Sequence, residues 1–380
     1  MHENAQANRI PRAPTERSAI RQLDVIRVVA MLAIFSHHLW KTVIVAPQGK
    51  LQGALDIVFS SASDGVILFN IISGFLLAMP YLGPECRPFA GYRSFLQKRF
   101  LRIIPPYYLA LLLFTLANIL HFGFPLVPAL DTLLQHVLFI NSLNYSNMFL
   151  NFSHFWYLGL LAQFYLLFPF ALGLFLRIGP TRAALSIIAL CWGSWMILAW
   201  VFPTTDPAYP GMAENLMHFN LPGRLPEFAI GMWLASLWNP SGVSNRMPVL
   251  ERSFSLFAAA MVIYVIAGTP FSSLMSLPLI HVYHVAISAI VCLILLLWPP
   301  VARAGESPFL KAVAAQSYAI YIVHHPLFSY LGVMPSKVTH TLGNFVILMA
   351  LLLPLSYLLA RILNWLSAEI MNKFSRREPR

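Results

Sequence analysis

The chain has 380 residues, of which 58% are hydrophobic and only 10% are charged, and its mean hydropathy is +0.69. This composition excludes a soluble globular domain and predicts an all-α fold, a polytopic bundle of membrane helices. The formal net charge of +11 would indicate a nucleic-acid partner in a soluble protein. In a membrane protein, basic residues instead collect in cytoplasmic loops, so we expect no nucleic acid here.

Ten apolar stretches have about the 20 residues that a helix needs to cross a bilayer. The predicted transmembrane helices cover residues 23–45, 57–81, 104–122, 153–176, 183–202, 223–239, 253–269, 279–298, 312–332 and 342–364. With a cytoplasmic N-terminus, most of the 25 lysines and arginines flank cytoplasmic ends, and those on the other side are Lys41, Lys50, Arg224 and Lys337. This bias predicts two cytoplasmic termini and a multi-pass protein of the inner (plasma) membrane.

The predicted organisation is a cytoplasmic tail over residues 1–22, a ten-helix membrane domain over 23–364 and a basic cytoplasmic tail over 365–380. No cleavable signal peptide is expected. The apolar segment 130–140 is too short to cross the bilayer, which favours a re-entrant or membrane-surface helix. The cysteines are too scattered for a disulfide framework or a zinc site, and we expect no metal. They are Cys86, Cys191 and Cys292.

The first predicted span, "LDVIRVVAMLAIFSHHLW", carries ionisable side chains. Such groups are costly at membrane depth and therefore face a protein interior or a wet cavity. Arg27 and His38 are eleven residues apart, which places them on one helix face, about 16 Å apart along the axis. Asp24 has the spacing of an ion pair with Arg27. Taken alone, His38 also fits a core histidine bonded to a backbone carbonyl.

Two further pairs stand one helical turn apart. Arg99 and Arg102 precede the third span, and guanidinium groups suit phosphate oxygens, although this stretch alone favours a positive-inside anchor. Arg224 and Glu227 fit a self-neutralising structural pair as well as a substrate site. The other candidates are His154, Trp156, Gln163, Tyr165, His281, His284, His324 and His325. Of these, Trp156, His281 and His284 also fit a position at the membrane interface.

Because successive spans alternate in direction and a helix rises about 1.5 Å per residue, these side chains separate into two levels. The cytoplasmic level, which suits phosphate, holds Asp24, Arg27, Arg99 and Arg102. The outer level, which suits hydroxyl recognition and proton transfer, holds His38, His154, Arg224, Glu227, His281, His284 and His324. The first span contributes to both levels.

These residues occur in motifs through which the chain resembles the acyltransferase-3 family of integral membrane acyltransferases. "LDVIRVVAMLAIFSHH" has the Arg-x10-His spacing, and "IISGFLL" and "RFLRIIPPYY" are similar to the Ser-Gly-Phe and Arg-x-x-Arg segments. The later matches are "FWYLGLLAQFYLLFP", "RLPEFAIGMWLA" and "SYAIYIVHHPLF". The chain departs from many relatives at Leu161 and Ala162, where they carry glutamates. This departure leaves open a divergent acceptor, a role assumed by Glu227, or a catalytically silent assembly partner.

The resemblance implies transfer of an acyl group, acetyl by default, from cytoplasmic acyl-CoA to a hydroxyl of a sugar or glycan on the extracytoplasmic side of the lipid membrane. His38 would be the general base, because an imidazole pKa near 6.5 suits proton transfer at neutral pH. His324 would orient His38 or protonate the leaving thiolate, and a covalent acyl-histidine route stays open. The implied donor-binding residues are Arg27, Arg99 and Arg102, and the implied acceptor-binding residues are Trp156, Arg224 and Glu227.

The alternative function is a polytopic transporter or flippase of a glycan or small metabolite, since cavity-lining histidines also fit a carrier. Carriers commonly use intramembrane carboxylates for ion coupling and are built from two related halves. The sequence shows neither a carboxylate pair at mid-membrane nor an internal repeat. These features favour the enzyme.

Overall fold

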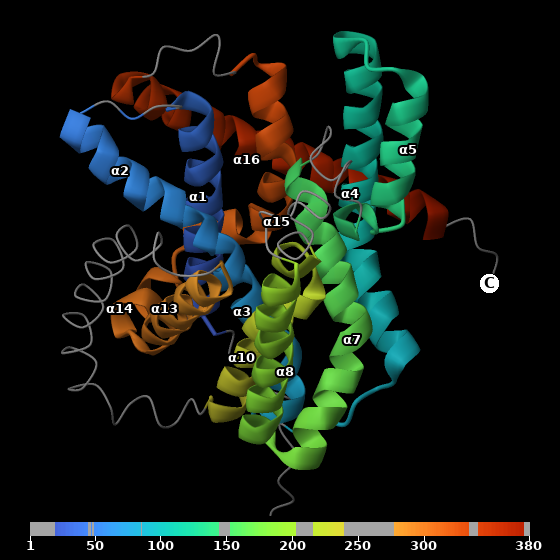
Figure 1. Ribbon diagram of the computed structural model, residues 1–380. Helices are drawn as coiled ribbons and strands as arrows, with labels where there is room; N and C mark the ends of the chain where they lie inside the picture. The colour runs from blue at the N-terminus through green and yellow to red at the C-terminus, as the bar shows by residue number, and fades with distance from the viewer. Residues whose placement is uncertain are drawn as a thin grey trace, which may run out of the picture.

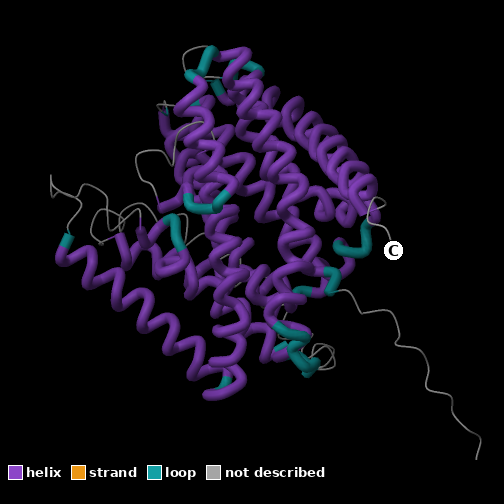
Figure 2. Tube along the Cα trace, turned by 90° about the vertical axis from the view of Figure 1, so that its right-hand side faces the viewer, coloured by secondary structure: helices purple, strands orange, loops and turns teal. Residues whose placement is uncertain are grey.

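The computed structural model describes residues 20–44, 47, 49–84, 86–143, 153–202, 216–238, 277–333 and 341–375. Within these ranges the protein is helical and contains no strand (Figures 1 and 2), which confirms the predicted all-α fold. The helices are α1 (Gln22–Val43), α2 (Gly49–Ser61), α3 (Gly65–Leu82), α4 (Tyr92–Phe122), α5 (Leu126–Val137), α7 (Trp156–Ile178), α8 (Pro180–Val201), α10 (Leu221–Leu237), α13 (Leu277–Leu297), α14 (Pro299–Ala304), α15 (Pro308–Tyr330) and α16 (Leu342–Ser375).

Seven helical runs in the described ranges are long and apolar enough to cross a membrane, so the chain is a multi-pass membrane protein. They are Gln22–Val43, Gly49–Leu82, Tyr92–Phe122, Trp156–Ile178, Pro180–Val201, Leu279–Leu297 and Leu342–Lys373. The predicted count of ten is not confirmed. The predicted spans 223–239 and 312–332 correspond to α10 and α15, which are not among the seven, and 253–269 lies outside the described residues. The orientation of the termini stays a prediction.

Helices α10 and α15 lie inside the bundle, where protein rather than lipid surrounds them. Most α10 side chains between Gly223 and Ala235 are buried, against α3 and α8, and α15 packs between α1 and α16. Polar side chains are tolerated in such helices because neighbouring helices can satisfy them. By contrast, α8 and α16 expose large apolar side chains such as Leu190 and Leu351, as helices in contact with lipid do.

The predicted span 57–81 belongs to a longer helical segment, Gly49–Leu82, in which a 3-10 turn interrupts the α-helix. Between α2 and α3, residues Ala62–Asp64 form a single 3-10 turn. Gly65 follows this turn and lies directly against α1, where an added Cβ would be 2.5 Å from the carbonyl oxygen of Ala30. A short 3-10 segment inside a long helix re-aims its side chains and often marks a functional position.

Glycines bring α3 and α10 into backbone contact. A Cβ on Gly74 would collide with the carbonyl oxygen of Phe228, and a Cβ on Gly231 would collide with that of Ile71. Small residues allow this approach between membrane helices. Gly74 is the glycine of the "IISGFLL" motif, so the motif has a direct packing role.

The apolar segment predicted near 130–140 is largely helix α5, which lies beside α4 (Figure 1). The hydroxyls of Tyr107 and Tyr108 on α4 donate to the carbonyls of His136 and Val137. With 12 residues, α5 is too short to cross a bilayer, as predicted. Its position relative to the membrane stays a prediction.

We expect Gly74→Ala to destabilise the protein by about 1–3 kcal/mol, because the added methyl group overpacks a contact between two backbones. The matched control is Gly173→Ala on α7, where nothing lies within 4 Å of an added Cβ. Thermal unfolding of both variants in detergent measures the effect. Equal melting temperatures for the two variants would contradict the packing role of Gly74.

Candidate functional site

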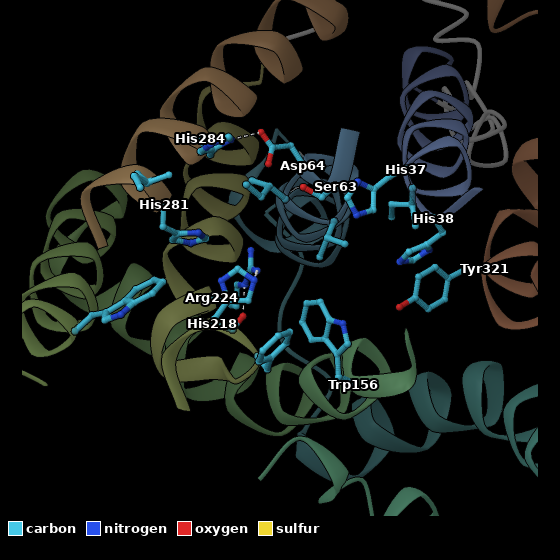
Figure 3. Close-up of a pocket in the computed structure, with 16 residues that line it drawn as sticks. His37, His38, Ser63, Asp64, Trp156, His218, Arg224, His281, His284 and Tyr321 are labelled. Carbon is cyan, nitrogen blue, oxygen red and sulfur yellow. Dashed lines mark hydrogen bonds and ion pairs between the residues drawn. The ribbon is translucent and has the colours of Figure 1, made fainter. Parts of the chain in front are cut away.

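A cavity of about 290 Å³, lined by both ionisable and apolar side chains, lies among α1, α3, α7, α8, α10, α13, α15 and the 3-10 turn Ala62–Asp64 (Figure 3). Five imidazoles line it, together with one carboxylate and one guanidinium: His37, His38, His218, His281, His284, Asp64 and Arg224. Trp156, Trp195 and Tyr321 supply aromatic surface. The cavity therefore collects ionisable groups from helices that are far apart in the sequence.

The tautomers of His38 and His324 follow from their hydrogen bonds when both rings are neutral. His324 Nδ1 lies 2.7 Å from the carbonyl oxygen of Tyr321, and a carbonyl can only accept, so Nδ1 carries the proton. His324 Nε2 then accepts from His38 Nδ1 at 2.8 Å. This leaves the lone pair of His38 on Nε2, the nitrogen that a general base uses. Within this pair, His324 rather than His38 is bonded through its ring to a backbone carbonyl.

Two more histidines complete the packing around this pair. His154 Nε2 lies 3.1 Å from the carbonyl oxygen of Ile322 and therefore donates to it. Its ring stacks on His325 with a centroid distance of 5.1 Å, and the Tyr321 hydroxyl donates to the His154 carbonyl. Among the described residues, no group of three or more histidine, cysteine or acidic side chains has the geometry of a metal site.

The predicted acceptor residues Arg224 and Glu227 form a buried ion pair. Arg224 Nη1 lies 2.9 Å from Glu227 Oε1, and the two side chains are 5% and 0% exposed. Asn70 donates to Glu227 Oε2 at 2.5 Å, and His281 Nε2 lies 3.0 Å from Oε1. Arg224 lines the cavity with Trp156 beside it, 5.5 Å from the ring centroid, whereas Glu227 lies behind the cavity wall.

His218, just before α10, was not predicted from the sequence as a site residue. Arg224 Nη2 donates to its Nε2 at 3.0 Å. Burial, together with the adjacent guanidinium, lowers the pKa of His218 well below its ordinary value, so the ring is neutral. Arg224 Nε donates to the His218 carbonyl at 2.6 Å. The guanidinium is thus held from two sides and presents a fixed face to the cavity.

Asp64, in the 3-10 turn between α2 and α3, was also missed. Its Oδ2 lies 2.6 Å from His284 Nδ1, and the histidine and aspartate side chains are 21% and 18% exposed. The available sequence signal was an acidic residue inside a predicted span, which by itself indicates a functional position.

The predicted donor residues Arg27, Arg99 and Arg102 lie near one another, but none lines the cavity. Arg27 pairs with Asp24 at 2.9 Å, the predicted ion pair. Arg102 is close enough to both other arginines for their like charges to interact. Among the described residues, no acidic side chain forms an ion pair with Arg102, whereas Glu227 neutralises Arg224.

Buried tyrosines occupy the region between the arginines and the cavity. Tyr165 on α7 interacts electrostatically with Arg99 and Arg102, and it is in turn a neighbour of Tyr157. The rings of Tyr157 and Tyr321 meet with a centroid distance of 5.4 Å, and Tyr321 lines the cavity. Buried tyrosines on α7 and α15 are therefore found both beside the arginines and at the cavity.

The positions at which the chain departs from the family motif lie outside the cavity. Leu161 and Ala162 are buried in the bundle, with exposed fractions of 6% and 3%. The adjacent Gln163 accepts from the backbone N–H of Leu221 at 3.0 Å and donates to Asn220 at 3.0 Å. This part of the motif positions the start of α10.

Fold and site together define a multi-pass helical membrane protein with a histidine-lined polar cavity. The chain belongs to the acyltransferase-3 family, because the family's acyltransferase domain matches residues 20–361. It is 22% identical over 339 residues to a protein of Staphylococcus aureus (strain COL) whose O-acetyltransferase name is provisional, covering 81% of this chain and 50% of that protein. The protein of strain MSSA476 gives the same values.

A peptidoglycan O-acetyltransferase, OatA of Listeria monocytogenes serovar 1/2a (strain ATCC BAA-679 / EGD-e), is 22% identical over 338 residues, which cover 82% of this chain and 50% of OatA. The chain thus spans about half the length of these relatives. No solved structure shows significant similarity to it.

We expect Glu227→Gln to lower the stability of the protein by about 3–5 kcal/mol, because it leaves the buried Arg224 charge without its counter-ion. The control is Glu306→Gln, which removes an exposed pair with Arg21 whose side chains are each 55% exposed and which costs about 1 kcal/mol or less. Thermal unfolding in detergent compares the two. Similar small losses in both variants would contradict the structural role of Glu227.

Proposed function

We propose that the protein is an O-acyltransferase of the inner (plasma) membrane. It transfers an acyl group, acetyl by default, from cytoplasmic acyl-CoA to a hydroxyl of a sugar or glycan on the extracytoplasmic side. The observation that carries this proposal is the fixed tautomer of His38. This residue lines the cavity, and its hydrogen bond with His324 leaves the lone pair on Nε2. Family membership and the names of the relatives support the reaction class and a glycan acceptor.

In the proposed reaction, His38 is the general base. Its Nε2 accepts the proton of the acceptor hydroxyl while the oxygen attacks the thioester carbon. The carbon–sulfur bond then breaks, and the proton passes from His38 to the thiolate, which leaves as CoA thiol. His324 acts as a positioning residue, because its bond from His38 Nδ1 keeps the lone pair on Nε2.

The donor would enter from the arginines. Arg27, Arg99 and Arg102 would hold the phosphates of CoA, since guanidinium groups bind phosphate oxygens through paired N–H donors. The pantetheine arm would follow Tyr165 and Tyr157 to the cavity. Its required reach of about 16 Å is the axial offset between Arg27 and His38 on one helix. Arg224 and Trp156 would contact the acceptor from the cavity wall.

We expect His38→Ala to reduce acyl transfer by at least about 100-fold, the usual contribution of a general base. The measurement is transfer of label from radioactive acetyl-CoA to membrane or extracytoplasmic glycan, with the purified protein or inverted vesicles. His121→Ala, an exposed histidine near the end of α4, is the control for an imidazole outside the site. A His38→Ala protein with ordinary activity would exclude His38 as the base, and transport of the glycan without labelling would favour a carrier.

We expect Arg102→Ala to raise the KM for acetyl-CoA roughly tenfold or more, because it removes a phosphate contact worth about 1.5–3 kcal/mol. The acceptor KM should stay unchanged. Arg93→Ala is the matched control, since Arg93 is an exposed arginine near the start of the same helix, α4. If both variants bind CoA with the affinity of the unmodified protein, Arg102 does not belong to the donor site.

A further inference from the structure

The cavity wall contains a second histidine system, Asp64 with His284, that the reaction described above does not use. Asp64 is the only acidic residue among the described residues that line the cavity. His284 Nδ1 lies 2.6 Å from Asp64 Oδ2. An ionised carboxylate can only accept, so His284 donates to it through Nδ1.

The position of Asp64 is built by the fold. The 3-10 turn Ala62–Asp64 interrupts a helical run of membrane length, and the contact of Gly65 with the Ala30 carbonyl holds this turn against α1. Asp64 is close enough to His37 of α1 and His281 of α13 to interact with both electrostatically. The carboxylate is therefore surrounded by imidazoles from two other helices.

If Asp64 and His284 only held α13 against the 3-10 turn, we would expect their side chains to be as buried as those of the ion pair between Arg224 and Glu227, which are 5% and 0% exposed. The Asp64 and His284 side chains are instead 18% and 21% exposed, and both face the cavity (Figure 3). A carboxylate and an imidazole that reach a cavity can form hydrogen bonds with hydroxyl groups of a ligand. They also lie on a part of the wall separate from His38 (Figure 3).

We propose that Asp64 and His284 form a binding site for the acceptor, in which they form hydrogen bonds with hydroxyl groups of a sugar while His38 acts on the hydroxyl that is acylated. This inference rests on the proposed function and names the acceptor as a polyhydroxylated molecule. Arg27, Arg99 and Arg102 do not line the cavity that holds this pair, so we expect the pair to contribute to acceptor binding and not to binding of acyl-CoA.

The test uses the full chain in nanodiscs, with chitotetraose as the acceptor probe and radioactive acetyl-CoA as the donor. The variants are Asp64→Asn and His284→Asn. The second keeps an amide donor toward Asp64 but lacks Nε2, so the pairing between the helices is retained. The control is Asp131→Asn on α5, an exposed carboxylate that accepts from Gln135. Calorimetry measures probe affinity, label transfer measures both KM values, and thermal unfolding checks the fold.

We expect both variants to bind the probe at least tenfold more weakly and to show a matching rise in acceptor KM, with an unchanged KM for acetyl-CoA. The control variant should equal the unmodified protein in each measurement. Unchanged probe affinity in folded variants, or equal rises of both KM values, would overturn the inference about Asp64 and His284. Label transfer by the unmodified protein would still support the proposed function in that case.

The opposite failure is also distinguishable. Probe binding that is lost in His284→Asn, without any label transfer by the unmodified protein, would support the sugar site and overturn the acyltransferase proposal. If Asp64→Asn does not fold, His284→Asn decides by the same criteria. An unmodified protein that neither binds nor acylates the probe would overturn both.

Discussion

Glu227 is a fully buried carboxylate whose partners come from three helices, and the middle of the bundle is arranged around it. Arg224 neutralises it within α10, Asn70 reaches it from α3, and His281 approaches it from α13. Removing such a charge from water is favourable only when partners satisfy it. The backbone contact at Gly74 brings α3 close enough to α10 for Asn70 to reach Glu227. Helix packing and charge neutralisation are therefore one constraint.

Hydrogen-bond partners also set the state of the histidines. An imidazole has two nitrogens, and the partner of one decides what the other can do. A backbone carbonyl acts through His324 to leave the His38 lone pair on Nε2, and Asp64 accepts from Nδ1 of His284. His218 differs, because its Nε2 is already occupied by Arg224. Chemically identical side chains thus have different hydrogen-bond partners, and therefore different capacities, within one cavity.

In the proposed function, charge recognition and chemistry are separated along α1. Its arginine lies near Arg102, its histidine lies at the cavity, and aromatic rings fill the region between. This separation suits a family of membrane acyltransferases whose donor and acceptor would meet from opposite sides of a bilayer. The apolar residues Leu161 and Ala162 leave the cavity intact, because they pack inside the bundle while Gln163 holds the start of α10.

Composition and helical periodicity are local properties, so they were enough to predict the all-α membrane class, the positions of Arg27 and His38 on one helix face, and the order of the family motifs. The sequence also indicated the ion pairs Asp24–Arg27 and Arg224–Glu227, which are neighbours on one helical turn. Only the tertiary structure decided that Glu227 lies behind the cavity wall and Asp64 on it. The pairs His38–His324 and Asp64–His284 join residues more than 200 positions apart, and no local pattern encodes which distant helices will meet.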